Sequence, residues 1–268
     1  MTIVIGGNTL SGNFNSNGDS QNTPTVVTDS LQLWLDPGNN SSFANTSNYY
    51  DCGYGCQYYS SNPGCTNCNT QIKDISGNGR DGTFQNGASM TYASSGGGAM
   101  NFNTASQYVS CGSLGSIYSY GTICLWINAA AMSNYNNCFS THYLGGNAGF
   151  RFEENASGNF GVVVGNDAGT YAGHNYIPSG MATGTWYHVV ITWSIPGSNV
   201  TGYLNGSQTF NDSTTYFAST LPSISVGSGF SSSRYWNGLI GPVMIYSKAL
   251  SATEVLQNYN NGRIRYGI

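Results

Sequence analysis

Residues 185–193 read Thr-Trp-Tyr-His-Val-Val-Ile-Thr-Trp, and residues 203–207 read Tyr-Leu-Asn-Gly-Ser. In the first stretch large apolar side chains recur at every second position up to Trp193, which is the period of a half-buried β-strand. The pair Asn205-Gly206 is the preferred two-residue turn of a β-hairpin. This part of the chain therefore predicts one strand at 185–193 and then a hairpin, in which the Asn205-Gly206 turn joins the strand at 200–205 to the residues after it.

The same alternation recurs along most of the sequence. Leu31, Leu33 and Leu35 share one side of a predicted strand that stops at the turn signal Asp36-Pro37-Gly38-Asn39. Further strands are predicted at 98–103, 107–111, 122–128, 149–154, 160–164, 200–205, 223–227 and 243–246. No helical pattern separates these strands, so the fold class is all-β: a two-sheet antiparallel jelly-roll sandwich.

One short helix is predicted near the C-terminus. Ser251 and Glu254 form a capping box, in which the serine caps the first turn and the glutamate reaches back to it. Leu250 and Val255 stand at the positions of a hydrophobic staple. The predicted helix ends before Gly262.

Two regions stand apart from the predicted sandwich. Residues 1–29 are rich in Gly, Asn and Ser and are predicted to form an N-terminal arm, either a flexible tail or an anchor that docks on a neighbour. Residues 30–268 are predicted to form the jelly-roll domain, with an irregular, cysteine-containing insertion at about 38–71.

The chain carries very few charges. Its 268 residues include 7 Lys+Arg and 11 Asp+Glu, which gives 7 % charged residues and a net charge of -4. So few cations cannot neutralise a row of phosphates, which argues against nucleic-acid binding. No apolar run reaches the ~20 residues of a membrane-spanning helix, and 13 % aromatic residues argue against disorder.

The N-terminus, Met1-Thr2-Ile3-Val4-Ile5-Gly6-Gly7, has no basic region and only a short apolar stretch, so no secretory signal peptide is predicted. The composition is nevertheless that of an extracellular β-protein. Either a mature secreted chain that received a start Met by cloning or a particle protein released by lysis fits these two observations.

Enzymatic activity is not expected. Glycoside hydrolysis, the chemistry most often found on such a sandwich, needs two carboxylates about 5–9 Å apart. Glu153 and Glu154 are adjacent and should point to opposite sides of a strand, and Glu254 caps the helix. No catalytic residues are therefore assigned. His188, in the middle of a strand, is predicted to be a packed core histidine, and Cys124 a small buried hydrophobe.

Two kinds of metal site are considered. Cys52, Cys56, Cys65 and Cys68 lie within 17 residues, and disulfides, a tetrahedral zinc ion or free thiols all agree with their spacing. Asp36 and Asp74 flank turns where carboxylates could converge on calcium. The alternative is that both aspartates cap their own turns through backbone amides, and this alternative is favoured.

Aromatic residues in predicted loops are the candidate ligand-binding residues. Tyr118, Tyr120, Tyr235 and Trp236 are surrounded by Asn, Gly and Ser. Flat rings with neighbouring amides suit neutral sugars, and they equally suit a protein interface.

Several of these motifs together resemble a known family. They are Leu-Gln-Leu-Trp-Leu-Asp (31–36), Asp-Ile-Ser-Gly-Asn-Gly (74–79), the strand at 185–193, Tyr-Leu-Asn-Gly (203–206) and the stretch from Trp236 to Glu254. In this order they resemble the laminin-G-like, concanavalin A-type lectin/glucanase superfamily. The resemblance implies a jelly roll used to bind sugars or proteins or to attach to a particle. Many members have an acidic residue where this chain has Gly241-Pro242, which weakens any calcium carry-over.

The C-terminal end reads Val255-Leu256-Gln257-Asn258-Tyr259-Asn260 and then Arg265-Tyr266-Gly267-Ile268. It resembles versions of this module in structural proteins of tailed bacteriophages. We therefore expect a non-enzymatic virion structural protein, a capsid decoration or fibre-like component on the virion surface. Its N-terminal arm would contact other virion proteins, and the protein would be a homo-oligomer or present in many copies. The alternative is a carbohydrate-binding adhesin module, secreted or on a virion, that touches host-surface glycans.

Overall fold

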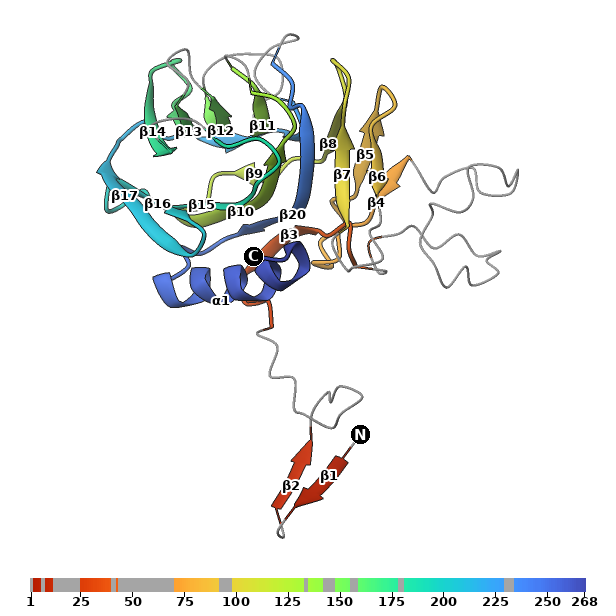
Figure 1. Cartoon of the computed structure of the whole chain (residues 1–268). Helices are drawn as coiled ribbons and strands as arrows, with labels where there is room; N and C mark the ends of the chain where they lie inside the picture. Colours follow the sequence, from red (N-terminus) through yellow and green to blue (C-terminus); the bar gives the residue numbers. More distant parts are fainter. Residues whose placement is uncertain are drawn as a thin grey trace.

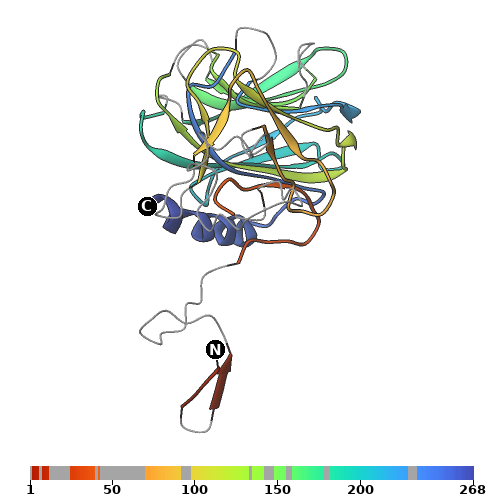
Figure 2. The ribbon, with the colours of Figure 1, turned by 90° about the vertical axis from the view of Figure 1, so that its right-hand side faces the viewer.

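The computed structural model describes residues 2–5, 8–11, 25–39, 42, 70–91, 98–132, 135–141, 148–154, 159–177, 181–228 and 234–268. Two antiparallel sheets of eight strands face each other, and α1 lies along the outer side of one of them (Figures 1 and 2). We call the sheet next to α1 the lower sheet and the other the upper sheet, as they stand in Figure 1. This arrangement confirms the all-β sandwich predicted from the alternation of apolar residues.

The lower sheet runs in the order β17 (Ser207–Ser213), β16 (Asn199–Leu204), β15 (Trp186–Ser194), β10 (Tyr120–Ala129), β20 (Gly238–Tyr246), β7 (Ala99–Phe102) and β6 (Ser89–Thr91), with β3 (Leu31–Leu35) also paired to β20. The upper sheet runs in the order β14 (Tyr171–Ile177), β13 (Phe160–Gly165), β12 (Gly149–Glu154), β11 (Asn137–Ser140), β19 (Ile224–Val226), β8 (Tyr108–Cys111), β5 (Gly82–Gln85) and β4 (Gln71–Ile72). Two small sheets pair β1 (Thr2–Ile5) with β2 (Asn8–Ser11) and β9 (Gly115–Ser116) with β18 (Thr220–Leu221).

The core lies between the two sheets and is built by the predicted alternation. Leu33 and Leu35 of β3 are fully buried in it, and so are Phe152 of β12 and Ile191 of β15. The central strands thus contribute alternate side chains to one continuous apolar layer, which supplies most of the driving force for folding.

The predicted hairpin turn is present between β16 and β17. Asn205 and Gly206 both have positive φ angles, 50° and 78°, as the tightest hairpin turns require. A Cβ on Gly206 would also lie 2.9 Å from Leu256 of α1, so the turn and the helix approach each other closely.

Helix α1 spans Ala252–Arg263, and its capping box is formed by Ser251 and Glu254 as predicted. The prediction that it ends before Gly262 is wrong, because Gly262 lies inside the helix. A Cβ at this position would stand only 2.5 Å from the indole of Trp126, so glycine lets the helix lie directly on the lower sheet. A 3-10 helix, Ile264–Tyr266, follows.

An aromatic layer fills the space between α1 and the lower sheet. The Trp126 ring stacks on Tyr259 of the helix with centroids 5.7 Å apart and lies 5.0 Å from the ring of His188. His188 is completely buried. The prediction of a packed core histidine is confirmed.

The last residues of the predicted arm contact the sandwich. Val27 is buried, its N–H donates to Oδ1 of Asn258 at 2.9 Å, and its carbonyl accepts from the Tyr246 hydroxyl. Because both partners belong to the C-terminal part of the domain, residues 25–29 are integrated into the fold.

Candidate functional site

A hollow of about 250 Å³ opens where three loops meet near the first residue of β20. We call it the rim pocket. It is lined by Asn103, Thr104, Ala105, Ala131, Asn136, Tyr235, Trp236 and Asn237. No Lys, Arg, Asp or Glu is among these lining residues, so the pocket is polar and uncharged.

Hydrogen bonds between side chains and the backbone hold two of the three loops in place. The N–H groups of Asn103 and Thr104 both donate to Oε1 of the buried Gln107, at 2.7 and 3.0 Å. The side-chain amide of Asn136 donates to the carbonyl of Ala131 at 3.1 Å. In the third loop the Trp236 N–H donates to the Gly227 carbonyl and the Asn237 carbonyl accepts from the Ala130 N–H, both at 2.9 Å. All three loops are therefore held by hydrogen bonds, which gives the pocket a preformed shape.

Tyr235 and Trp236, both predicted as ligand-binding residues, come together at this pocket but differ in exposure. Tyr235 is partly exposed, whereas Trp236 is only 1 % exposed. Trp236 was predicted from its place in a loop to be a ligand-binding ring, but its side chain is not exposed to a ligand. Its side chain enters the core, where it packs edge-on against Phe160, and its Nε1 donates to the Leu239 carbonyl at 3.3 Å.

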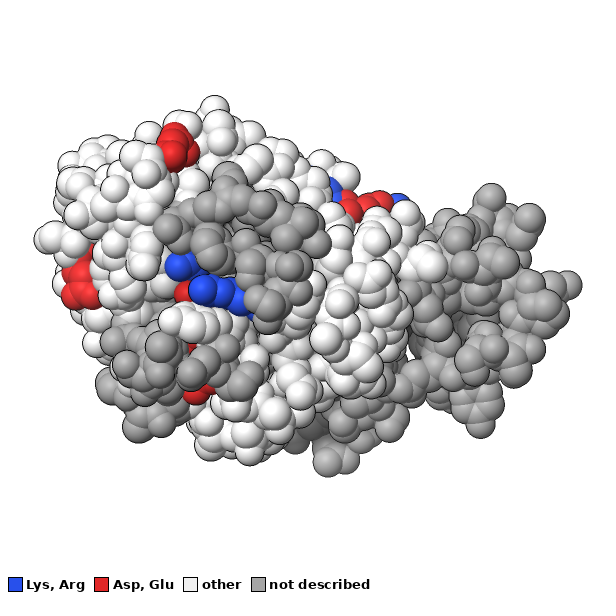
Figure 3. Space-filling model, turned by 90° about the horizontal axis from the view of Figure 1, so that it is seen from above, with Lys and Arg blue, Asp and Glu red and all other residues white. Residues whose placement is uncertain are grey.

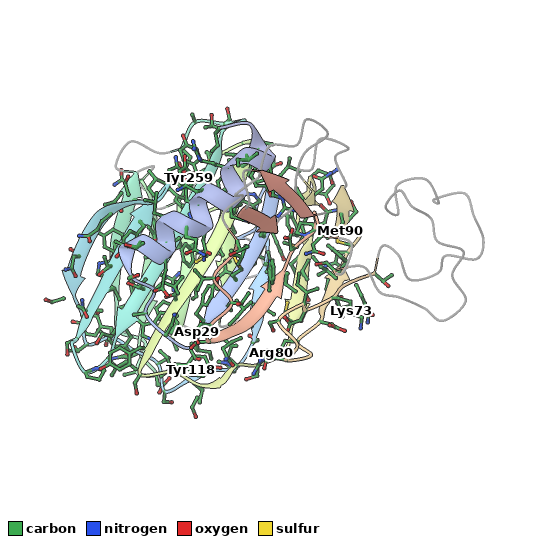
Figure 4. The ribbon with its side chains drawn as sticks, turned by 90° about the horizontal axis from the view of Figure 1, so that it is seen from below. Asp29, Lys73, Arg80, Met90, Tyr118 and Tyr259 are labelled. Carbon is green, nitrogen blue, oxygen red and sulfur yellow. The ribbon has the colours of Figure 1, made fainter. Side chains whose placement is uncertain are left out.

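Tyr118 and Tyr120 lie elsewhere. They stand before and at the first residue of β10, whereas the rim pocket is reached from the loop after its last residue, Ala129. The Tyr118 hydroxyl donates to Oε1 of Gln32, and its side chain lies on the underside of the sandwich (Figure 4). Tyr120 is 47 % exposed. The structure thus separates the four predicted aromatic residues into two places.

An ion-pair cluster stands on the outer face of the upper sheet, next to the rim pocket along the chain. Glu153 is 4 % exposed and accepts from Nε of Arg151 at 3.1 Å and from Nη1 of Arg234 at 2.9 Å. The Arg234 guanidinium also lies 4.1 Å from the centroid of the Tyr135 ring. Figure 3 shows basic and acidic atoms grouped on this side. Because Tyr135 precedes Asn136 and Arg234 precedes Tyr235, the cluster fixes two of the pocket's walls.

The two adjacent glutamates are placed differently. Glu153 lies on the same face of β12 as Arg151, whereas Glu154 follows the alternation of the core-facing Phe152. Burial raises the pKa of the Glu154 carboxyl, and its Oε2 has no hydrogen-bond partner among the described residues. Since strand alternation sends the two carboxyls to opposite faces, they do not flank a common bond.

Both predicted calcium ligands are occupied by protein donors. Asp36 accepts two hydrogen bonds from Arg265, at 2.7 and 2.9 Å, and one from the Gly38 N–H. Asp74 accepts from the backbone N–H groups of Trp34, Ser76 and Arg80, each at 3.0 Å. The turn-capping alternative is therefore what the structure shows, and the described residues contain no cluster of metal-binding side chains.

The cysteines fall into two groups. Cys52, Cys56, Cys65 and Cys68 lie outside the described residues, so the choice among disulfides, zinc and free thiols stays open. Three other cysteines, Cys111, Cys124 and Cys138, are free and buried. Burial raises the pKa of the Cys124 thiol, and the prediction that Cys124 is a small buried hydrophobe is confirmed.

Sequence comparison places the chain in a family. The model of the concanavalin A-like lectin/glucanases superfamily, Laminin_G_3, matches residues 102–256, more than half of the chain. The chain belongs to this superfamily. A comparison of the chain with curated proteins gives no match. Among the described residues of the chain, no helix is both long enough and apolar enough to span a membrane.

Solved structures share the fold of this superfamily member. The botulinum neurotoxin serotype D binding domain has a TM-score of 0.61 at 16% identity, with 87% of this chain and 52% of that chain covered. Domain 4 of AbnA, an extracellular arabinanase from Geobacillus stearothermophilus solved with arabinotriose, has a TM-score of 0.60 at 16% identity, with 85% and 98% covered. The binding domain of Paraclostridial Mosquitocidal Protein 1 has a TM-score of 0.57 at 17% identity, with 87% and 52% covered. The chain therefore spans about half the length of the toxin and mosquitocidal domains.

Proposed function

We propose that this lectin-like jelly roll is a non-enzymatic binding module that holds a neutral glycan in the rim pocket. The observation that carries the proposal is the chemistry of the pocket lining. Three Asn residues, Thr104 and Tyr235 line one hollow, and no charged residue is among its lining residues. Amides and hydroxyls both donate and accept hydrogen bonds, as sugar hydroxyls do, and an aromatic ring covers the apolar face of a sugar.

Proteins of the same fold support the proposal. Domain 4 of the arabinanase AbnA was solved with arabinotriose, and a ligand-binding domain of botulinum neurotoxin serotype D was solved with N-acetylneuraminic acid. The first is one domain of an extracellular arabinanase, and the second is described as a ligand-binding domain. They show that this architecture is compatible with saccharide recognition, whereas the identity of the glycan bound here depends on residues of this chain.

The rim pocket can be tested by paired substitutions. Tyr235→Ala and Asn237→Ala should each weaken binding of a glycan selected on an array of neutral glycans by about tenfold, because each removes a contact worth roughly 1–2 kcal/mol. Calorimetry on the same glycan measures the loss. Tyr171→Ala is the control, since Tyr171 is 52 % exposed and does not line the pocket. Equal affinities of all four proteins, or an array without a bound glycan, would contradict the proposal.

We also propose that the module binds without cleaving its ligand. The two adjacent glutamates lie on opposite faces of β12, and the Glu153 carboxylate is held by two arginines. Incubation with the selected glycan should therefore release no reducing ends. If turnover is found and persists in Glu153→Gln and Glu154→Gln, neither of these carboxyls is the catalytic acid and the proposal of a pure binding module fails.

We propose that the module works at the surface of a virion, as a capsid decoration or fibre-like component in many copies. The low charge of 7 % supports close packing of copies, because it limits repulsion between neighbours. The resemblance of the C-terminal end to tailed-bacteriophage structural proteins supports it too. The alternative is a secreted adhesin module.

A sedimentation experiment separates these two settings. The full chain should co-sediment with intact particles, and antibodies against the sandwich should label the particle surface. Deletion of residues 1–24 should abolish co-sedimentation while the sandwich keeps its unfolding midpoint. Full chain found only in the soluble fraction would favour the secreted adhesin.

A further inference from the structure

Tyr135 has a backbone conformation that is costly for a tyrosine. Its φ angle is 68°, in the left-handed region, whereas the other described residues with positive φ angles are glycines, serines and asparagines. Bulky side chains rarely adopt this conformation, because Cβ then lies too close to the following carbonyl oxygen. Strain of this kind persists only where the surrounding structure enforces it, and it is concentrated at sites that clamp ligands.

Two contacts hold Tyr135 in this conformation. Its backbone N–H donates to the carbonyl of Glu154 at 2.9 Å, at the end of β12. Its ring centroid lies 4.1 Å from the guanidinium carbon of Arg234, and a cation over an aromatic face attracts the ring. Nη1 of Arg234 in turn donates to the buried Glu153 at 2.9 Å. A buried carboxylate therefore fixes a guanidinium, and the guanidinium fixes the ring of Tyr135.

The same contacts place the ring beside the rim pocket. Tyr135 precedes Asn136 and Arg234 precedes Tyr235, and both Asn136 and Tyr235 line the pocket. Consecutive Cα atoms are about 3.8 Å apart. Two walls of the pocket are thus each one residue away from the stacked pair of Tyr135 and Arg234. Because Tyr135 is not itself a lining residue, its ring lies at the edge of the pocket.

The ring is open to solvent although it is held in place. Tyr135 is 37 % exposed and belongs to neither of the two apolar clusters of the sandwich. A tyrosine that served only to fill the core would be buried in one of them. A side chain whose position is fixed by its neighbours and whose surface is accessible is what a recognition site requires.

The size of the rim pocket determines what such a ring can contact. The pocket measures about 250 Å³, below the ~300–1,000 Å³ of most small-molecule sites. A ligand of several sugar units therefore does not fit inside it and has to continue over the surface at its edge. Tyr135 provides an aromatic surface at that edge.

We propose that Tyr135 is a second aromatic platform of the binding site. The rim pocket holds one unit of a neutral oligosaccharide, and the next unit lies on the Tyr135 ring. This inference rests on the function proposed above and deepens it, because it names the ligand class as an oligosaccharide of at least two units. The contacts to Glu154 and Arg234 hold the ring in place before the ligand arrives, so less conformational freedom is lost on binding.

Calorimetry with defined saccharides tests the ligand class. The full chain is titrated separately with cellotriose, maltotriose, xylotriose and arabinotriose, and with glucose, xylose and arabinose. At least one trisaccharide should bind about tenfold more tightly than its own monosaccharide, because its second unit gains contact with an aromatic anchor. Equal affinities for each trisaccharide and its monosaccharide, or no binding of any trisaccharide, would overturn the proposal.

Substitutions of Tyr135 separate recognition from a structural role. Tyr135→Phe keeps the ring and should keep the affinity for the active trisaccharide, whereas Tyr135→Ala and Tyr135→Gly should both lower it by about tenfold. Glycine accepts the φ angle of 68° without strain, so the glycine variant should have a higher urea midpoint than the alanine variant. Affinity that follows the urea midpoint instead of the ring would give Tyr135 a structural role only and overturn the proposal.

Tyr171→Ala is the matched control. The Tyr171 ring is also exposed and also lies over an arginine, with its centroid 5.4 Å from the guanidinium carbon of Arg151. It is joined through Gly165 to Gly149, the first residue of β12, whereas Tyr135 contacts Glu154, the last. Tyr171→Ala should therefore bind the active trisaccharide as the parent chain does, and a tenfold loss in this variant would contradict the placement of the second unit on Tyr135.

The rim-pocket variant distinguishes failure of this inference from failure of the proposed function. If Tyr235→Ala loses affinity for the active trisaccharide and Tyr135→Ala does not, the platform is disproved and the rim-pocket function stands. If Tyr135→Ala loses affinity and Tyr235→Ala does not, the ligand does not occupy the rim pocket, and the proposed function fails together with the inference that rests on it.

Discussion

Replacing Glu153 by alanine should lower the free energy of unfolding by about 3–5 kcal/mol, the usual cost of removing one partner from a buried ion pair. Its carboxylate is 4 % exposed and is shared by Arg151 and Arg234. The variant keeps two guanidinium groups close together without the carboxylate between them. The loss should be measured as a shift of the urea midpoint at an unchanged dependence on urea.

The connecting loops cannot replace the missing charge. Segments 142–148, 155–159 and 229–233 contain no Asp or Glu. Glu154, the nearest acid in sequence, lies on the opposite face of β12. Glu153→Gln should therefore also be strongly destabilised, although it keeps the size of the side chain. This variant separates the charge from the cavity that alanine leaves.

Asp29→Ala is the matched control for this prediction. Asp29 also contacts a cation, Lys248, at 2.7 Å, but it is exposed and Lys248 keeps Glu254 as a partner. Exposed pairs contribute little to stability, so its urea midpoint should stay close to that of the parent chain. Similar small losses in Asp29→Ala and Glu153→Ala would mean that the buried cluster is not held by its charges.

Features with a local cause could be predicted from the sequence. The hairpin at Asn205-Gly206 and the capping box at Ser251 depend on residues that are close in the chain, and both are present. The short strand β4 has no apolar alternation, so its pairing depends on the neighbouring strand and no sequence pattern indicates it. Strand β17 is polar as well, and only the Asn205-Gly206 turn before it indicates that it pairs. Gly262 reads as a helix stop, and only its contact with Trp126, from a distant strand, explains why the helix continues.

The candidate sites show the same division. The sequence predicts Tyr235 as a ligand-binding residue from its place in a loop. The burial of its neighbour Trp236 depends on Phe160, which lies 76 residues earlier in the chain. The alternation of β3 does place Trp34 opposite the core leucines, yet the pair of Asp36 with Arg265 joins residues that are 229 positions apart. Likewise, Arg151 and Glu153 share a strand face that alternation predicts, whereas Arg234 is brought to them only by the fold.

Acid should destabilise this protein through His188. Burial lowers the pKa of His188 in the folded chain from 6.5 to about 3. Below pH 6.5 the unfolded chain takes up a proton that the folded chain does not, so this contribution to stability is complete above pH 6.5 and is lost as the pH falls toward 3. The slope approaches about 1.4 kcal/mol per pH unit, and the loss from pH 6.5 to 4.5 amounts to about 2–3 kcal/mol.

The variant His188→Phe isolates this effect. Neither ring nitrogen of His188 has a hydrogen-bond partner among the described residues, and the ring lies 5.0 Å from Trp126 and 6.0 Å from Tyr259. Phenylalanine keeps these ring contacts and removes two unpaired polar atoms, so at pH 7 the variant should be at least as stable as the parent chain. Urea unfolding of both proteins from pH 7 to 4.5 gives a difference curve in which the common carboxylates and the other histidines cancel. The difference should widen steadily as the pH falls, because only the parent chain has to keep a neutral imidazole under the helix. Parallel curves would mean that His188 takes up its proton as readily in the folded chain as in the unfolded chain. The aromatic layer beneath α1 would then hold a charge below pH 6.5.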